Sequence, residues 1–334
     1  MRVRAWLIGG GAIAALVALD WLAPRALNPY YVTILSRIGI AVIAAVSLQL
    51  VNGFTGQFSI GHAGFMAIGA YASAALSVYA GAALLDAASQ IAPLGFARLL
   101  YFPLVLAFGG LVAAVSGIVV AVPALRLRGD YLAIATLGAG EIIRIAILNI
   151  DAVGGARGFS LASPAHPAID LRFESLGGVF GVALVTIAVI ARLVYAGGGL
   201  AFRAVREDET AAESIGIATT RVKVEAFLVA SFFAGVAGAL FAHSEGYIHT
   251  NSFGFVRSFE LVAFVVLGGL GSLSGAIIAA ATLTALPELL RGFGDWRMVL
   301  YSVLLIATMV LRPQGLLGQR ELWPLARMTR GGAK

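Results

Sequence analysis

The sequence predicts an all-α protein that crosses a membrane about ten times, with helices broken by glycine in both halves. The 334 residues are 60% hydrophobic and 12% charged, and their mean hydropathy is +0.94. A soluble domain carries roughly 25% charged residues, so this chain lacks the polar residues that would cover an apolar core. Its apolar residues also fall in runs of about twenty, the length that spans a bilayer. A water-soluble enzyme is therefore excluded, and membrane lipid surrounds most of the chain.

The apolar runs divide the chain into ten predicted spans. The first follows Arg2 and Arg4 but has no small-residue cleavage site after it, so we interpret it as a retained helix and not as a signal peptide. The third span is long and interrupted by glycine, and the eighth and ninth are separated by the glycine-rich segment 268–272. The spans lie near residues 5–23, 31–51, 60–85, 99–122, 131–150, 177–196, 222–244, 258–270, 273–290 and 297–311.

The distribution of basic residues predicts the orientation. Connections on the cytoplasmic side of a membrane protein carry an excess of lysine and arginine. With ten spans, Arg126, Arg203, Arg206, Arg221 and Lys223 all fall on the side that also holds both termini. We therefore expect both termini in the cytoplasm, and we treat residues 1–318 as one permease domain followed by a cytoplasmic, disordered tail at 319–334.

Several kinds of chemistry are not expected from the residues available. The chain has no cysteine and four histidines, and no two histidines have the metal-ligand spacing H-x3-H. Neither of its two lysines lies where a retinal pump would need one, and the phosphate-binding pattern G-x4-G-K-[ST] is missing. The net charge of +6 follows from the topology and does not indicate a nucleic-acid partner. We expect no catalytic site, metal or cofactor in this chain.

Two connections are long enough to carry a function. The outer loop at about 151–176 could be an ordered cap over the span ends or a docking surface, and the sequence leaves both open. In the inner loop at about 197–221, good helix formers run from Arg206 to Glu213, and Gly216 can end the helix in the left-handed conformation. We predict one short amphipathic helix outside the bilayer, with Ala211 and Ala212 exposed between acids. Such a helix suits a groove on another protein better than lipid headgroups.

This loop resembles the coupling segment of ABC importer permeases, in particular those of the branched-chain amino acid class. The pattern is R-E-D-E-x-A-A-E-x-x-G at 206–216. Further blocks resemble the same family in the same order: NGFTGQFSIGHAGF at 52–65, LRLRGDYLAIATL at 125–137, FFAGxAGAL at 232–240, VLGGLGS at 266–272 and LRPQGL at 311–316. The resemblance covers about 35–318 and fits the M-type subunit of the permease pair that such importers use.

The resemblance implies the partners and the mechanism. Two cytoplasmic ATPase subunits would use ATP and Mg and push on the coupling segment. A homologous second permease would complete the pathway, and a periplasmic binding protein would deliver the substrate. The coupling residues would be Arg203, Arg206, Glu207, Asp208, Glu209, Ala211, Ala212, Glu213 and Gly216.

Ionisable groups inside the membrane indicate function by default. Glu141 and Arg144 are three residues apart on one helix and can pair, either as a structural pair or as lining of the pathway or subunit interface. Arg37 lacks a local partner, which Glu260 or Glu225 could provide. His62 could relay protons, but a hydrogen-bonded structural role is the more economical interpretation.

The glycine-rich breaks at 53–64 and 268–275 are the second candidate site. Corresponding breaks in two halves of a transporter point to the substrate pathway, whereas small residues four apart can instead allow close helix packing. Both interpretations stay open. The residues concerned are Gly56, Gln57, Ser59, Gly61, His62, Gly64, Glu141, Arg144, Gly268, Gly269, Gly271 and Ser272.

Taken together, the sequence predicts a non-enzymatic permease subunit of an ATP-driven importer in a bacterial inner membrane. Its cargo would be branched-chain or other hydrophobic amino acids. Two alternatives are a permease of the same family for urea or short amides, and a proton-coupled secondary transporter that acts alone. The secondary transporter would need buried carboxylates and no docking helix.

Overall fold

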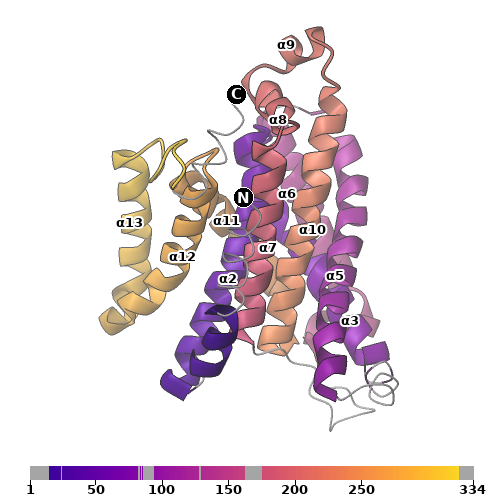
Figure 1. The fold of residues 1–334 in the computed structure, drawn as a ribbon, viewed down its shortest axis with the longest axis vertical. Helices are drawn as coiled ribbons and strands as arrows, with labels where there is room; N and C mark the ends of the chain where they lie inside the picture. The colour runs from indigo at the N-terminus through magenta and orange to yellow at the C-terminus, as the bar shows by residue number, and fades with distance from the viewer. Residues whose placement is uncertain are drawn as a thin grey trace, which may run out of the picture.

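The protein is a bundle of long apolar helices, as the sequence predicts. The computed structural model describes residues 15–23, 25–81, 83, 85, 94–127, 129–161 and 175–322. Eight stretches of this described chain are long and apolar enough to cross a membrane. The last of them, Leu273–Leu311, contains two helices that run side by side in opposite directions (Figure 1).

The described spans agree with the predicted ones to within a few residues at most boundaries. The predicted span at 5–23 lies mainly outside the described residues, of which 15–23 are helical. The long helices are α2 (Pro29–Gln49), α3 (His62–Leu76), α5 (Leu94–Ala124), α6 (Asp130–Leu148), α7 (Leu176–Tyr195), α10 (Thr219–Glu245), α11 (Phe255–Gly268), α12 (Leu273–Leu289) and α13 (Arg297–Leu311). The short helices are η1 (Leu50–Phe54), η2 (Ser77–Gly81), η3 (Asp151–Val153), η4 (Gly155–Arg157), α8 (Gly199–Glu207), α9 (Glu209–Ser214), η5 (Thr250–Phe253) and η6 (Leu290–Trp296).

Helix α10 forms the centre of the bundle. It packs against α2, α3 and α5, and its middle residues are almost completely buried. Small residues make this possible, since Gly69 of α3 and Gly109 of α5 both contact the backbone or small side chains around Gly235 and Ala239 of α10. Close approach of backbones is how helices gain packing energy in lipid, where the hydrophobic effect does not drive them together.

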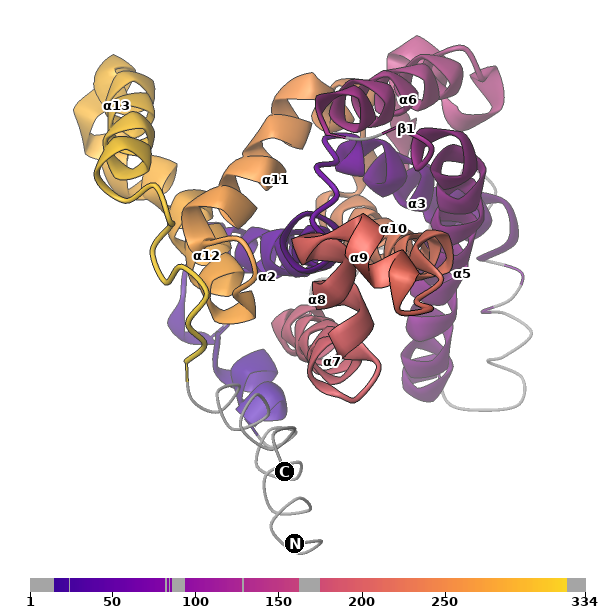
Figure 2. The ribbon, with the colours of Figure 1, turned by 90° about the horizontal axis from the view of Figure 1, so that it is seen from above.

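The outer surface is apolar, as lipid contact requires. Helix α13 has no buried residue, and side chains such as Val310 and Leu311 are 74% and 77% exposed. Figure 2 shows α13 standing apart from the central bundle, and its main contacts are with η6 and α12. The hairpin of α12 and α13 turns through η6, where Gly294 takes a positive φ of 56°.

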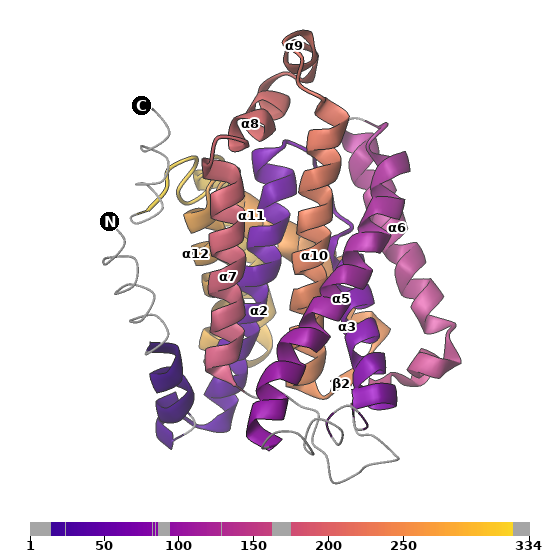
Figure 3. The ribbon, with the colours of Figure 1, turned by 45° about the vertical axis from the view of Figure 1, so that its right-hand side comes forward.

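The helices α8 and α9 lie beyond one end of the bundle (Figures 1 and 3). At the opposite end, the described part of the loop predicted at 151–176 is ordered. There η3 and η4 lead into β1 (Phe159–Ser160), which pairs antiparallel with β2 (Tyr247–Ile248), in the register Phe159 to Ile248 and Ser160 to Tyr247. Residues 162–174 of this loop lie outside the described part of the chain.

Candidate functional site

The predicted coupling helix consists of two helices, so the prediction of one helix over Arg206–Glu213 is wrong. Asp208 interrupts it with extended backbone angles (φ −157°, ψ 112°). Its carboxylate accepts hydrogen bonds from the backbone N–H groups of Thr210, at 2.8 Å, and Ala211, at 3.0 Å. The first N–H groups of a helix have no partner within that helix. By capping two of them, Asp208 favours the start of a new helix, α9, over the continuation of α8.

The end of α9 is as predicted. Gly216 adopts φ +87°, the left-handed conformation that glycine reaches at no steric cost. The N–H of Ile217 then donates to the carbonyl of Ala212, and the N–H of Gly216 donates to that of Glu213, both at 3.0 Å. These two bonds form a Schellman motif, which turns the chain sharply toward α10.

Helix α9 is fastened to the start of α10 through its acidic residues. Glu209 forms an ion pair with Lys223, and the Thr219 hydroxyl donates to Oε1 of Glu213 at 2.6 Å. Ala212 is 2% exposed, so the expectation that this alanine faces outward is wrong. The sequence analysis used Lys223 only for the orientation and did not predict its contact with α9.

The outward side of the helix pair is apolar at two points. Leu200 of α8 and Ile215 after α9 are 63% and 74% exposed, and Ala211 is exposed as predicted. Arg203 and Glu207 also face outward from α8. Exposed apolar side chains beyond the end of the bundle indicate a protein contact. The sequence signals for this surface are limited to a neighbouring glycine and the mixed charges of the segment.

Arg206 joins α8 to the bundle. Its Nη1 donates to the carbonyl oxygen of Gly53 in η1 at 2.9 Å, and 23% of its side chain is exposed. The stem of the same side chain packs against Gly56, where an added Cβ would lie 3.1 Å from its Cγ. An added Cβ at Gly271 would lie 2.6 Å from Nη1. One arginine of the predicted coupling segment therefore touches both glycine-rich breaks.

The two breaks also contact each other directly. Gln49 is buried, and its Nε2 donates to the carbonyl oxygens of Gly269, at 2.8 Å, and Ser272, at 3.1 Å. An added Cβ at Gly53 would lie 2.7 Å from the backbone nitrogen of Gly271. The breaks at 53–64 and 268–275, which are far apart in sequence, thus form one junction beneath α8. Gly269 and Gly271 have positive φ angles of 112° and 94° within it.

Between η1 and α3 the chain is held by side-chain hydrogen bonds. Asn52 and Ser59 bond reciprocally, through Nδ2 to the Ser59 carbonyl and from the Ser59 N–H to Oδ1, both at 3.1 Å. Gln57 is buried, and both polar atoms of its amide are without a hydrogen-bond partner in the described structure. A buried amide left unsatisfied is costly, so Gln57 is a candidate to gain a partner in another conformation.

The beginning of α3 packs tightly against α6. An added Cβ at Gly64 would lie 2.7 Å from Cα of Gly140, and Gly61 contacts the backbone of Thr136. For Gly61 and Gly64, these contacts favour the interpretation as close helix packing. His62 is buried and its Nε2 lies 2.8 Å from Oγ of Ser47 on α2, so it has the hydrogen-bonded structural placement that we expected.

The predicted intramembrane charges are all paired, three pairs within one helix and one between two helices. Glu141 and Arg144 pair at 2.7 Å, as expected from their spacing. The expectation for Arg37 is wrong, since it pairs at 2.8 Å with Glu245 at the end of α10. Glu260 instead pairs with Arg257, and Glu225 pairs with Arg221. These acids follow the helix spacing rule and find their partners on their own helix.

The chain after α13 returns to the same junction. Leu316 N–H donates to the carbonyl of Leu267 at 2.7 Å, and Gly315 packs on Gly269. Glu321 accepts hydrogen bonds from the N–H groups of Leu273 and Ser274, at 2.6 and 3.0 Å. Residues 319–322 therefore belong to the folded body and not to a disordered tail, whereas 323–334 lie outside the described residues.

These features define a class of protein. The chain is a multi-pass helical membrane protein whose broken helices meet beneath an external helix pair, an arrangement found in transporters. Residues 30–311 match the family described as "Branched-chain amino acid transport system / permease component". The chain belongs to this family.

Individual relatives are similar over different shares of the chain. The LivM branched-chain amino acid permease of Salmonella typhimurium is 38% identical over 257 residues, which are 69% of this chain and 60% of that protein. The LivH permease of Escherichia coli is 32% identical over 141 residues, covering 42% and 46%. The LsrC permease for autoinducer 2 import of Enterobacter sp. is 30% identical over 218 residues, covering 62% and 61%. The match thus spans about 60% of the LivM relative, and no solved structure matches the chain.

Proposed function

We propose that this chain is the membrane-spanning permease subunit of an ATP-driven importer for branched-chain or other hydrophobic amino acids. It carries out no chemistry itself. A second, homologous permease subunit completes the pathway, since relatives of this chain include both LivM and LivH permeases. Two ATPase subunits hydrolyse ATP with Mg on the cytoplasmic side, and a periplasmic binding protein supplies the substrate at the bacterial inner membrane.

The contact of Arg206 with both glycine-rich breaks carries this proposal. A force on α8 and α9 from an ATPase would reach Gly53 and Gly271 through one side chain, with a 2.9 Å hydrogen bond at its end. A transporter can bend at its helix breaks, because the backbone groups there already bond to partners that are not part of the regular helix. The junction is therefore suited to couple the external helices to an opening between the membrane segments.

The surface for the ATPase is the outward side of α8 and α9, with Leu200 and Ile215 as its apolar points. An ATPase that contacts this surface places it on the cytoplasmic side of the membrane. Arg203, Arg206 and Arg221 then lie in the cytoplasm, where an excess of basic residues is expected. Both termini are then cytoplasmic.

The test is reconstitution of the chain with a second permease, an ATPase pair and a binding protein encoded by neighbouring genes. Proteoliposomes with ATP are expected to accumulate radiolabelled leucine, and those without ATP are not. Urea, acetamide and autoinducer 2 are offered as competing cargoes. Import of leucine without any ATPase would overturn the proposal in favour of a secondary transporter, and import of urea alone would replace the cargo.

A matched pair of variants tests the coupling surface. Ile215→Asp puts a charge at the exposed apolar point and is expected to reduce co-purification with the ATPase. Arg221→Gln changes a side chain that is 80% exposed on nearby α10 and serves as the control. Undiminished assembly and uptake with Ile215→Asp would remove this surface from the proposal.

A further inference from the structure

A second polar feature lies in the half of the bundle away from α8 and α9. A cavity of about 430 Å³ opens between α2, α10, α11 and α12. Its charged side chains are Arg37, Arg257, Glu245, Glu260 and Glu288. All five lie within or at the end of candidate membrane spans, where charged side chains are costly and by default mark function. The junction beneath α8 does not use any of them.

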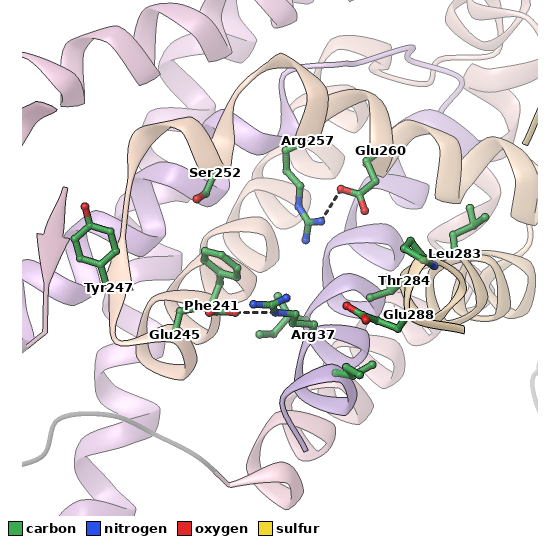
Figure 4. A pocket seen from close by; sticks show the side chains of 13 residues that line it. Arg37, Phe241, Glu245, Tyr247, Ser252, Arg257, Glu260, Leu283, Thr284 and Glu288 are labelled. Atoms are coloured by element: carbon green, nitrogen blue, oxygen red, sulfur yellow. Dashed lines mark hydrogen bonds and ion pairs between the residues drawn. The ribbon is translucent and has the colours of Figure 1, made fainter. Parts of the chain in front are cut away.

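The two arginines of this cavity are arranged to bind a carboxylate. Figure 4 shows Arg37 and Arg257 extending toward the middle of the cavity from α2 and α11. Arg37 bonds Glu245 through Nε at 2.8 Å, and Arg257 bonds Glu260 through Nη1 at 2.7 Å. Among the described residues, no hydrogen bond is made by the terminal nitrogens of Arg37, which leaves them for a further acceptor. Each guanidinium group is thus already paired with one glutamate, and a substrate carboxylate would be a second acceptor for the nitrogens that these pairs leave unbonded.

The carboxylates of the cavity exceed its arginines by one. Glu288 of α12 accepts a hydrogen bond from the Tyr30 hydroxyl, which is a neutral donor. The lining residues therefore carry two positive and three negative charges, an excess of one negative charge. That excess favours a bound cationic group such as an ammonium. Thr284 also lines the cavity, and its Oγ1 is buried without a hydrogen-bond partner in the described structure.

The remaining walls are apolar. Ile34 and Ile40 of α2, Phe241 of α10 and Leu283 of α12 line the cavity between the charged groups. A ligand that fits must present a carboxylate, an ammonium and an apolar body within a cavity of ordinary ligand size, for which volumes run from roughly 300 to 1,000 Å³. A zwitterionic apolar α-amino acid has these three parts.

We propose that this cavity is an amino acid binding site, with Arg37 and Arg257 for the carboxylate, Glu288 for the ammonium and the aliphatic walls for the side chain. The proposal rests on the proposed function for its cargo. Because the binding groups come from four helices, movement between α2, α10, α11 and α12 would create or disperse the site. A passing substrate would be held and then released in this way.

The test is equilibrium binding of radiolabelled leucine to the detergent-purified permease pair, without binding protein or ATP. Saturable binding is expected. Excess unlabelled leucine should compete, whereas 4-methylpentanoate, which lacks the ammonium, and 3-methylbutylamine, which lacks the carboxylate, should compete poorly. Equal competition by either analogue, or no saturable binding, would overturn the proposal.

Substitutions locate the site. Glu288→Gln keeps the size of the side chain, removes one charge-assisted hydrogen bond and is expected to weaken binding by about tenfold or more. The double variant Arg37→Glu with Glu245→Arg restores the ion pair with its charges exchanged, so a purely structural role predicts full recovery, and a carboxylate site predicts continued loss. The control is Arg221→Gln, which breaks an ion pair at the other end of α10.

The outcomes separate this proposal from the proposed function. Leucine binding that Glu288→Gln weakens, together with no ATP-driven uptake by the reconstituted complex, would support the site and refute the importer. ATP-driven uptake together with unchanged binding in Glu288→Gln would support the importer and refute the site. If the exchanged pair fails to assemble with its partner permease, Glu288→Gln decides.

Discussion

Replacing Arg206 with alanine tests whether one side chain holds the coupling helices to the membrane junction. The substitution removes the 2.9 Å bond to the Gly53 carbonyl, which lies in a buried segment, and the packing of the stem on Gly56. A hydrogen bond from a charged donor contributes about 1.5–3 kcal/mol. Since 23% of the side chain is exposed, we take about 2 kcal/mol, which raises the equilibrium constant for local opening about thirtyfold.

The assay is hydrogen–deuterium exchange of the purified permease pair, followed in peptides that cover η1 and residues 269–272. Both are expected to exchange faster in Arg206→Ala, together and by a similar factor, because one side chain supports both. Arg206→Lys keeps the charge but loses the fork of donors, so an intermediate rate is expected. Arg221→Ala, which changes an exposed arginine that does not contact the junction, should leave both peptides unchanged. Faster exchange at η1 alone, or at neither segment, would refute the idea of a shared anchor.

Three further predictions concern the same end of the molecule. Asp208→Ala removes the cap on the Ala211 N–H and is expected to destabilise α9 by about 1 kcal/mol, whereas Asp208→Asn keeps the cap; exchange at the start of α9 distinguishes them. Glu321→Ala removes the acceptor for the N–H of Ser274 and for the Tyr195 hydroxyl, which lies 2.5 Å from Oε1 of Glu321. The segment after α13 should then become accessible to protease, and equal cleavage of the wild type would contradict this. Asp208→Cys gives the cysteine-free chain one thiol, which a membrane-impermeant reagent should label only from the cytoplasmic side; labelling from outside would overturn the orientation.

Much of the fold was predictable because lipid imposes a strong rule on sequence. Apolar runs must be about twenty residues long, and the polar segments between them mark the ends of helices. The predicted span at 297–311 coincides with α13, and the span at 131–150 differs from α6 by one or two residues. Local signals worked for the same reason, as at Gly216, where a left-handed helix end needs a glycine.

The sequence pattern gave a wrong prediction where one residue can take either of two local roles. The residues from Arg206 to Glu213 are good helix formers, but Asp208 can either continue the helix or cap the next one. The cap wins because α9 must turn so that Glu209 reaches Lys223 on α10. The distance between those two residues is not part of any local pattern.

The sequence alone determined that this chain lives in a membrane, where its helices run and which family it belongs to, because these follow from composition, period and motif. Only the tertiary structure decided which distant residues meet. It brought Arg206 to Gly53 and Gly271, and it paired Arg37 with Glu245 instead of Glu260. In lipid every helix is already apolar, so the choice of neighbour depends on the fit of small residues and a few polar contacts. Those are properties of two surfaces at once, and no single segment contains them.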